Sequence, residues 1–203
     1  MPEEDGIVSA IAETGICVVP EFLPEEVAAD LLEEALRLDR EGAFRPAGVG
    51  RRDARAVVES VRGDRILWLD PQALSPPQAE YWRRVDDLRR ALNERLFLGL
   101  VELEAHYAIY PAGAGYQKHV DRFSDAGERS ISLSLYLNQS WRREDGGQLR
   151  VYLGDDTFDL LPTLGTLAVF RSDTVPHEVL PACRERISLT GWLKRRSLGG
   201  LRQ

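Results

Sequence analysis

Three residues in this chain of 203 residues have the types and the spacing of a metal site. His119 and Asp121 are two positions apart, and in an extended strand that spacing sends both side chains to the same face, about 7 Å apart along the chain. His177 begins another apolar segment and supplies a second imidazole. Two histidines and one carboxylate make the facial triad that leaves coordination positions open, which suits non-haem Fe(II) and oxygen chemistry. The residues therefore predict an iron site with room for further ligands.

The prediction depends on the whole set, because each member alone has an ordinary interpretation. A His-x-Asp triplet without a third ligand favours a surface turn, and a single arginine favours an exposed charge on an edge strand. Ligation is favoured because His177 is present and because Arg186 follows it by nine positions. The remaining histidine, His106, has no partner at ligand spacing and is predicted to be structural.

Two segments predicted as strands carry polar residues on one face and aliphatic residues on the other. Residues 131–137 and 186–193 alternate in this way, and alternation places successive side chains on opposite faces of a strand. The polar faces hold Ser132, Ser134 and Tyr136 in the first segment and Arg186, Ser188 and Thr190 in the second. The small polar face of 131–137 leaves room for a ligand. Burying the polar face of 186–193 is costly without partners, so we expect this face to line an anion pocket. Trp192 shares the face and is expected to pack in the core rather than stack on a substrate.

The elements around these residues change in kind near residue 100. Upstream, amphipathic helices are predicted from about 24 to 41 and from 75 to 99, the second opened by a capping box at Ser75 and Gln78. Downstream, short alternating segments between turn residues indicate antiparallel strands. These strands are predicted at 103–110, 115–120, 131–137, 148–153, 157–161, 166–170, 177–180 and 186–193, with a further β-prone run at 16–19. We expect a mainly β fold with flanking α-helices, in which a double-stranded β-helix (jelly roll) has the N-terminal helices packed on one sheet.

The composition excludes several classes of function. The chain has 26 basic and 33 acidic residues, a formal net charge of −7, which argues against general affinity for nucleic acid or anionic membranes. No segment approaches the roughly 20 apolar residues of a membrane span, and the first residues do not resemble a secretory signal. Cys17 and Cys183 lack metal-binding spacing, and two reduced thiols favour a cytoplasmic protein. With 43% apolar residues, 1–203 is predicted to be one domain, with a helical part at 1–100 and a jelly-roll core at 101–195.

Several motifs in a fixed order carry a family resemblance. They lie at 62–68, 110–121, 136–138, 146–150 and 176–179, with Arg186 after them. On these motifs, residues 44–192 resemble the 2-oxoglutarate and Fe(II)-dependent dioxygenases of the prolyl 4-hydroxylase family, and within it the hypoxia-inducible-factor prolyl hydroxylases and their bacterial relatives. The resemblance implies that Fe(II) is held by His119, Asp121 and His177. It also implies a 2-oxoglutarate pocket formed by Tyr110, Tyr136, Arg186 and Thr190, with Tyr136 and Arg186 on the distal carboxylate.

The resemblance further implies the reaction and the partner. A prolyl residue of a protein substrate is hydroxylated with 2-oxoglutarate and O₂, succinate and CO₂ are released, and ascorbate supports the activity. In this family the equivalent of residues 44–62 is a finger that folds over the substrate. The implied substrate contacts are Arg62, Asp64, Tyr116 and Arg129, with Arg62 and Asp64 paired at the base of the finger. The partner presents its proline in an extended or loop segment, and elongation factor Tu is a precedent among bacterial relatives.

Two alternatives stay open at the level of the sequence. A related oxygenase could act on another residue or on a small molecule, because the metal ligands and the arginine are shared across the superfamily while loops such as 44–62 set the target. A cupin-like module could bind the metal without turnover. Formation of succinate in the presence of iron separates this module from both enzymes.

Overall fold

The computed structural model describes residues 2–48, 62–121 and 129–196. Its helices are α1 (Pro2–Glu13), α2 (Glu25–Arg40) and α3 (Pro76–Leu96), with a short 3-10 helix at Arg143–Asp145. The predicted capping box is confirmed, because the Ser75 hydroxyl accepts from the Gln78 backbone N–H and the Gln78 side chain accepts from the Ser75 N–H. None of the described helices is long and apolar enough to cross a membrane.

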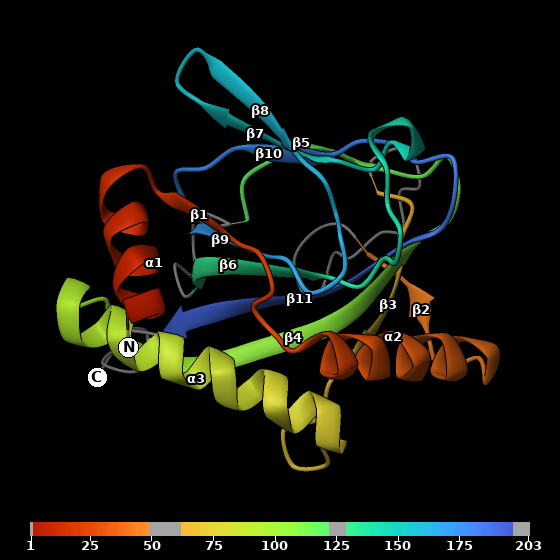
Figure 1. Ribbon diagram of the computed structural model, residues 1–203, viewed down its shortest axis with the longest axis horizontal. Helices are drawn as coiled ribbons and strands as arrows, with labels where there is room; N and C mark the ends of the chain where they lie inside the picture. Colours follow the sequence, from red (N-terminus) through yellow and green to blue (C-terminus); the bar gives the residue numbers. More distant parts are fainter. Residues whose placement is uncertain (1, 49–61, 122–128, 197–203) are drawn as a thin grey trace, which may run out of the picture.

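The described strands form two antiparallel sheets. They are β1 (Ile16–Val19), β2 (Arg45–Pro46), β3 (Arg65–Trp68), β4 (Leu100–Tyr110), β5 (Tyr116–His119), β6 (Arg129–Tyr136), β7 (Leu149–Leu153), β8 (Asp156–Leu160), β9 (Leu167–Arg171), β10 (His177–Val179) and β11 (Arg186–Arg195). The larger sheet has the order β1-β9-β6-β11-β4-β3-β2 and the smaller the order β5-β10-β7-β8. Figure 1 shows the smaller sheet on one side of the larger sheet and α2 and α3 on the other. The predicted jelly roll with helices on one sheet is confirmed.

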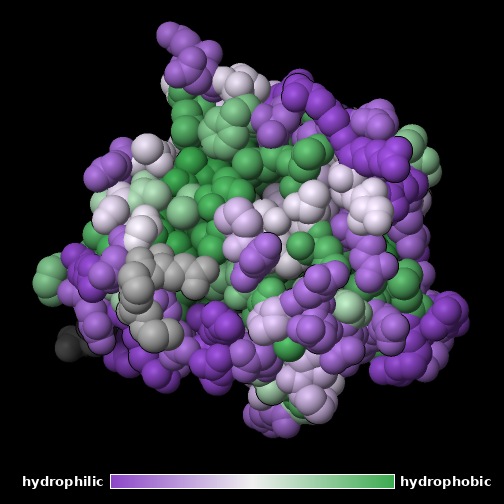
Figure 2. Space-filling model, in the orientation of Figure 1, coloured by the Kyte–Doolittle hydropathy of each residue, from purple (hydrophilic) through white to green (hydrophobic). Residues whose placement is uncertain are grey.

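Alternation along the central strands divides the apolar side chains between two clusters. On β6, Ile131, Leu133 and Leu135 pack in the cluster that includes the helices, whereas Tyr136 packs in the cluster between the sheets. Figure 2 shows polar side chains over the helices at the bottom of the view and apolar side chains gathered above them. The polar faces of β6 and β11 therefore point between the sheets, as the alternation predicts.

The sequence does not predict α1, β2 or β3. Ile7, Val8 and Ile11 of α1 are buried, and the helix packs against α3 and β1. Gly6 weakens the helical signal of this segment, so tertiary packing decides its structure. The four residues of β3 do not alternate, and the pairing with β4 determines their conformation.

Candidate active site

The structure brings the three predicted metal ligands together. His119 is the last residue of β5, His177 is the first residue of β10, and the two are directly opposite in this antiparallel pair. Asp121 lies beyond the end of β5, so the chain after the strand, and not alternation within it, turns its carboxylate toward the histidines. One ligand atom from each residue lies within 4.8 Å of the other two. This geometry can hold one metal ion.

The imidazoles are oriented by backbone carbonyls. His119 Nδ1 lies 2.7 Å from the carbonyl oxygen of Gln117, and His177 Nδ1 lies 3.1 Å from that of Val175. A carbonyl can only accept, so each Nδ1 carries the proton and each Nε2 keeps its lone pair. These Nε2 atoms face Asp121, at 3.4 Å for His119 and 3.9 Å for His177. The donor set fits a divalent metal.

Two residues that the sequence did not single out for this role hold the carboxylate of Asp121. Oδ2 accepts hydrogen bonds from the Ser132 hydroxyl at 2.6 Å and from the Trp192 indole N–H at 3.0 Å. Ser132 is on β6 and Trp192 on β11, so the larger sheet holds a ligand of the smaller sheet's metal site. Alternation along the two strands predicts that both side chains point between the sheets. It does not predict that they lie within hydrogen-bonding distance of Asp121.

The charge states of the ligands suit metal binding. Burial raises the pKa of Asp121, but the neighbouring imidazoles, whose protonated forms would stabilise the carboxylate, and the Ser132 hydroxyl outweigh burial and hold that pKa below its usual range. Burial lowers the pKa of His177. At neutral pH the aspartate is therefore ionised and His177 is neutral, the forms that coordinate metals.

The triad opens onto a cavity of about 110 Å³ between the sheets, which contains a buried cation. Arg186 is 2% exposed, and its Nε donates to the carbonyl of Gly147 at 2.8 Å. No carboxylate of the described residues lies within 4 Å of its guanidinium. The Tyr136 hydroxyl, also buried, has no hydrogen-bond partner in the described part of the chain. A buried cation beside an unsatisfied donor fits the carboxylate of a ligand.

The other predicted pocket residues lie around this cation. The rings of Tyr110 and Tyr136 are centred 5.4 and 5.2 Å from the Arg186 guanidinium carbon. Burial raises the pKa of both phenols, so each stays protonated and can donate to an anion at neutral pH. Thr190 lines the same cavity, and its hydroxyl lies 3.4 Å from that of Ser188.

The predicted substrate contacts have partners within the protein. Arg62 and Asp64 form the predicted ion pair, and the Tyr116 ring stacks on His119. Arg129 pairs with Glu104 at 2.8 Å and lies over the ring of Trp192. Arg62, Tyr116 and Arg129 line the cavity of the triad, whereas Asp64 does not. Most of the predicted finger, at 49–61, lies outside the described residues.

The sequence also predicts roles for two other residues of the cavity wall, His106 and Trp192. His106 is not part of the metal-ligand group, and its ring contacts those of Trp68 and Trp192, with centroids 4.7 and 5.3 Å away. Trp192 is buried and also lines the cavity. Packing and contact with a ligand are therefore both available to this tryptophan.

Comparison with known proteins identifies the family of this chain. The family described as the 2OG-Fe(II) oxygenase superfamily matches residues 105–194. Human Egl nine homolog 1 is 32% identical over 197 residues, which cover 92% of this chain but 45% of the human protein. Mouse prolyl hydroxylase EGLN3 is 32% identical over 194 residues, which cover 92% of this chain and 81% of the mouse protein.

Solved structures agree with these relatives. A prolyl-4-hydroxylase from Pseudomonas putida is 44% identical, with a TM-score of 0.88 over 96% of this chain and 100% of that one. A prolyl hydroxylase from Trichoplax adhaerens, solved with a peptide fragment of the hypoxia-inducible-factor oxygen degradation domain, is 28% identical, with a TM-score of 0.86 over 94% of this chain and 88% of that one. The chain belongs to the prolyl hydroxylase family of the 2OG-Fe(II) oxygenases.

Proposed function

We propose that this protein hydroxylates a prolyl residue in a protein substrate, with Fe(II), 2-oxoglutarate and O₂. One observation carries the proposal: a two-histidine, one-carboxylate group and a buried arginine without a carboxylate partner among the described residues share one enclosed cavity. This arrangement accommodates a dicarboxylate that reaches from the metal to the arginine.

Each residue of the cavity has a distinct task in this proposal. His119, Asp121 and His177 hold Fe(II), which with 2-oxoglutarate and O₂ supplies the oxidising chemistry that ends in succinate and CO₂. Arg186 pairs with the distal carboxylate of 2-oxoglutarate, and the Tyr136 hydroxyl donates a further hydrogen bond to it. Tyr110 and Thr190 line the pocket and fix the direction of the bound cosubstrate. The buried walls exclude water, which strengthens the contact between the guanidinium and the carboxylate.

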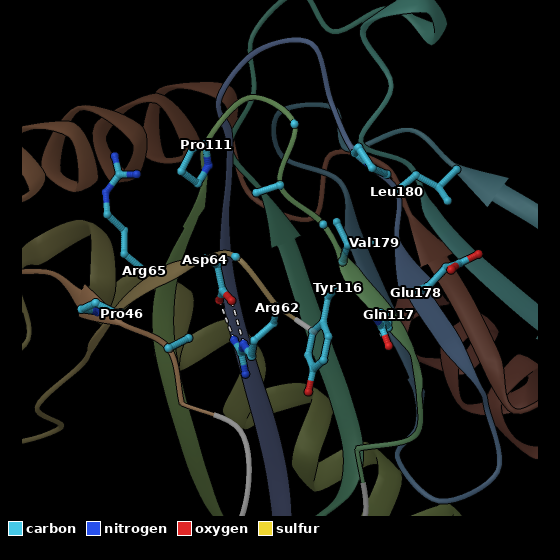
Figure 3. Close-up of a pocket in the computed structure, with 16 residues that line it drawn as sticks. Pro46, Arg62, Asp64, Arg65, Pro111, Tyr116, Gln117, Glu178, Val179 and Leu180 are labelled. Carbon is cyan, nitrogen blue, oxygen red and sulfur yellow. Dashed lines mark hydrogen bonds and ion pairs between the residues drawn. The ribbon is translucent and has the colours of Figure 1, made fainter. Parts of the chain in front are cut away.

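The protein substrate is proposed to lie in a second, more open cavity of about 620 Å³. This groove shares Arg62, Tyr116 and Val179 with the active-site cavity, so a chain lying in it reaches the mouth of the metal site. Figure 3 shows side chains from β5, from the segment at 62–65, and from β10 and the residues after it around this groove. An extended segment with a proline fits this continuous path better than a compact small molecule does. Elongation factor Tu is the candidate that the family resemblance offers.

Three further elements belong to this proposal. Ascorbate supports activity by keeping the metal reduced. The protein acts in the cytoplasm, in keeping with the free thiols of Cys17 and Cys183. Residues 1–203 act as one domain, which is supported by a shared apolar cluster containing Ile7, Leu31 and Leu193.

The test is incubation of the purified protein with a cell lysate, Fe(II) and 2-oxoglutarate, followed by mass spectrometry for peptides that gain one oxygen on proline. Purified elongation factor Tu forms a second arm, and His177→Ala is the control. Oxygen gained on other residues would favour the alternative of a related oxygenase. Absence of succinate with the wild-type protein under all conditions would favour a metal-binding module and contradict the proposal.

A further inference from the structure

A column of four side chains leads from the protein interior to one metal ligand. At its base the fully buried carboxylate of Asp64 accepts hydrogen bonds from Arg62 Nε at 2.7 Å and from Arg62 Nη2 at 2.5 Å. The guanidinium carbon of Arg62 lies 4.7 Å from the centre of the Tyr116 ring. Figure 3 shows the ion pair and this ring side by side. The Tyr116 ring in turn stacks on the imidazole of His119, with centroids 3.6 Å apart and planes 22° apart.

The backbone ties the same segments together. Arg62 and Tyr116 form an isolated antiparallel bridge, and the Gly63 N–H donates to the carbonyl of Gly115 at 3.2 Å. These backbone contacts therefore fix the spacing between the two segments that carry the side-chain column. Its position does not depend on flexible side chains alone.

The two histidines of the triad differ in their surroundings, and only one needs such support. His177 begins a strand that lies between β5 and β7, its side chain is 6% exposed, and the ring of Phe170 meets it edge-on at 4.6 Å. His119 ends β5, at the edge of the smaller sheet, and its side chain is 18% exposed. Apart from the other members of the triad, its ring has a local bond to Gln117 and the stack on Tyr116.

We propose that Asp64, Arg62 and Tyr116 are positioning residues that hold the imidazole of His119 in the plane required for metal binding. The proposal rests on the metal site of the proposed function but not on the identity of the substrate. Asp64 and Arg62 make two hydrogen bonds to each other and are largely buried, so a structural task suits them better than recognition of a peptide. Tyr116 transmits their position to His119 through its ring.

The pairing also has an electrostatic consequence. A lone guanidinium near the triad would repel a divalent cation, whereas the carboxylate of Asp64 neutralises it. Arg62 can therefore stack on Tyr116 without weakening the metal site. Asp64→Asn leaves that charge uncompensated and should weaken metal binding although Asp64 is not a ligand.

The test measures Co(II) binding to the full-length protein by titration calorimetry and by visible absorption, without 2-oxoglutarate or substrate. Tyr116→Leu removes the stacked ring and should weaken Co(II) binding about 10- to 100-fold, the usual effect of losing a residue that orients a metal ligand. The Co(II) absorption bands should shift as well, because the His119 ring turns. Tyr116→Phe keeps the ring and should retain wild-type affinity and bands.

Arg65→Met is the matched control for Arg62→Met. Arg65 lines the same groove and makes a similar two-point pair with Asp39, both bonds at 2.6 Å, but no contact with Tyr116 or the triad is present. Arg62→Met should weaken Co(II) binding, and Arg65→Met should not. Thermal melts followed by circular dichroism confirm that each variant is folded.

Two results would overturn the proposal. The first is wild-type Co(II) affinity and absorption in folded Tyr116→Leu. The second is an equal loss of affinity in Arg62→Met and Arg65→Met, which would indicate general destabilisation. Failure of the wild-type protein to hydroxylate any proline would contradict the proposed function, but would leave this measurement of metal binding unaffected.

Discussion

Replacement of Arg186 by leucine should separate binding of 2-oxoglutarate from stability of the fold. In the structure Arg186 is 2% exposed and has one hydrogen bond, to the carbonyl of Gly147. No carboxylate of the described residues compensates its charge within 4 Å. The guanidinium is thus held in a site that a bound dicarboxylate would complete. Its removal should weaken binding of 2-oxoglutarate far more than it destabilises the folded protein.

The size of the effect follows from the burial of the pair. Truncation of one partner of a buried, hydrogen-bonded charge pair costs about 2 to 5 kcal/mol. At 1.4 kcal/mol per factor of ten, the dissociation constant of 2-oxoglutarate should rise about 30- to 4,000-fold. The free protein loses the bond to Gly147 but also loses an uncompensated buried charge, and these effects offset each other. The melting temperature without ligand should therefore change little.

The assay compares two ligands by titration calorimetry, with Mn(II) in place of Fe(II) so that no turnover occurs. 2-Oxoglutarate carries the distal carboxylate, whereas 2-oxopentanoate has the same carbon chain and ends in a methyl group. Arg186→Leu should weaken binding of 2-oxoglutarate strongly and leave binding of 2-oxopentanoate nearly unchanged. Equal losses for both ligands, or no loss for 2-oxoglutarate, would show that Arg186 does not bind the distal carboxylate.

Other predictions test the metal site, the ion pairs and the finger. Asp121→Glu keeps the charge but displaces a carboxylate that Ser132 holds at 2.6 Å, and metal sites tolerate only about 0.2 Å of error, so iron-dependent succinate formation should be lost. Arg65 lowers the pKa of Asp39, so Arg65→Met should reduce the free energy of unfolding by about 1 kcal/mol at pH 7, measured by urea denaturation. Because the pKa of Asp39 is depressed on folding, this difference should persist above about pH 4 and disappear as pH falls further. Shortening the segment 45–57 should reduce proline hydroxylation, measured by mass spectrometry, much more than 2-oxoglutarate affinity; equal effects would argue against a finger.

Much of the site was predictable from local pattern. Alternation along 131–137 and 186–193 placed Tyr136 and Arg186 on the inner face, and in the structure Arg186 lines the cavity while the Tyr136 ring is centred 5.2 Å from its guanidinium carbon. Alternation predicts these directions because each strand packs one face against helices and lines a cavity with the other. It says nothing of which distant side chains meet across the cavity, so the bonds from Ser132 and Trp192 to Asp121 required the fold.

The predicted substrate contacts show a different limit. A motif identifies that Arg62, Asp64 and Tyr116 occur together, but not whether they face a ligand or one another. The structure shows that Asp64 and Arg62 face one another: the side chain of Asp64 is fully buried and that of Arg62 is 14% exposed. Contact of Arg62 or Tyr116 with a substrate stays a prediction. Two charges with this exposure and two short hydrogen bonds between them are committed to each other.

Both ends of the active-site cavity depend on the spacing between the two sheets. At the metal end, His119 and His177 come from the smaller sheet, while Ser132 and Trp192 of the larger sheet hold Asp121. At the other end, Arg186 belongs to β11 of the larger sheet and donates to Gly147, just before β7 of the smaller one. A shift of one sheet against the other would therefore disturb the metal ligands and the anion site together. Since closely packed interiors resist such shifts, the length of the cosubstrate that fits is a property of the packed core, whereas the identity of the protein substrate can vary with the loops at the mouth.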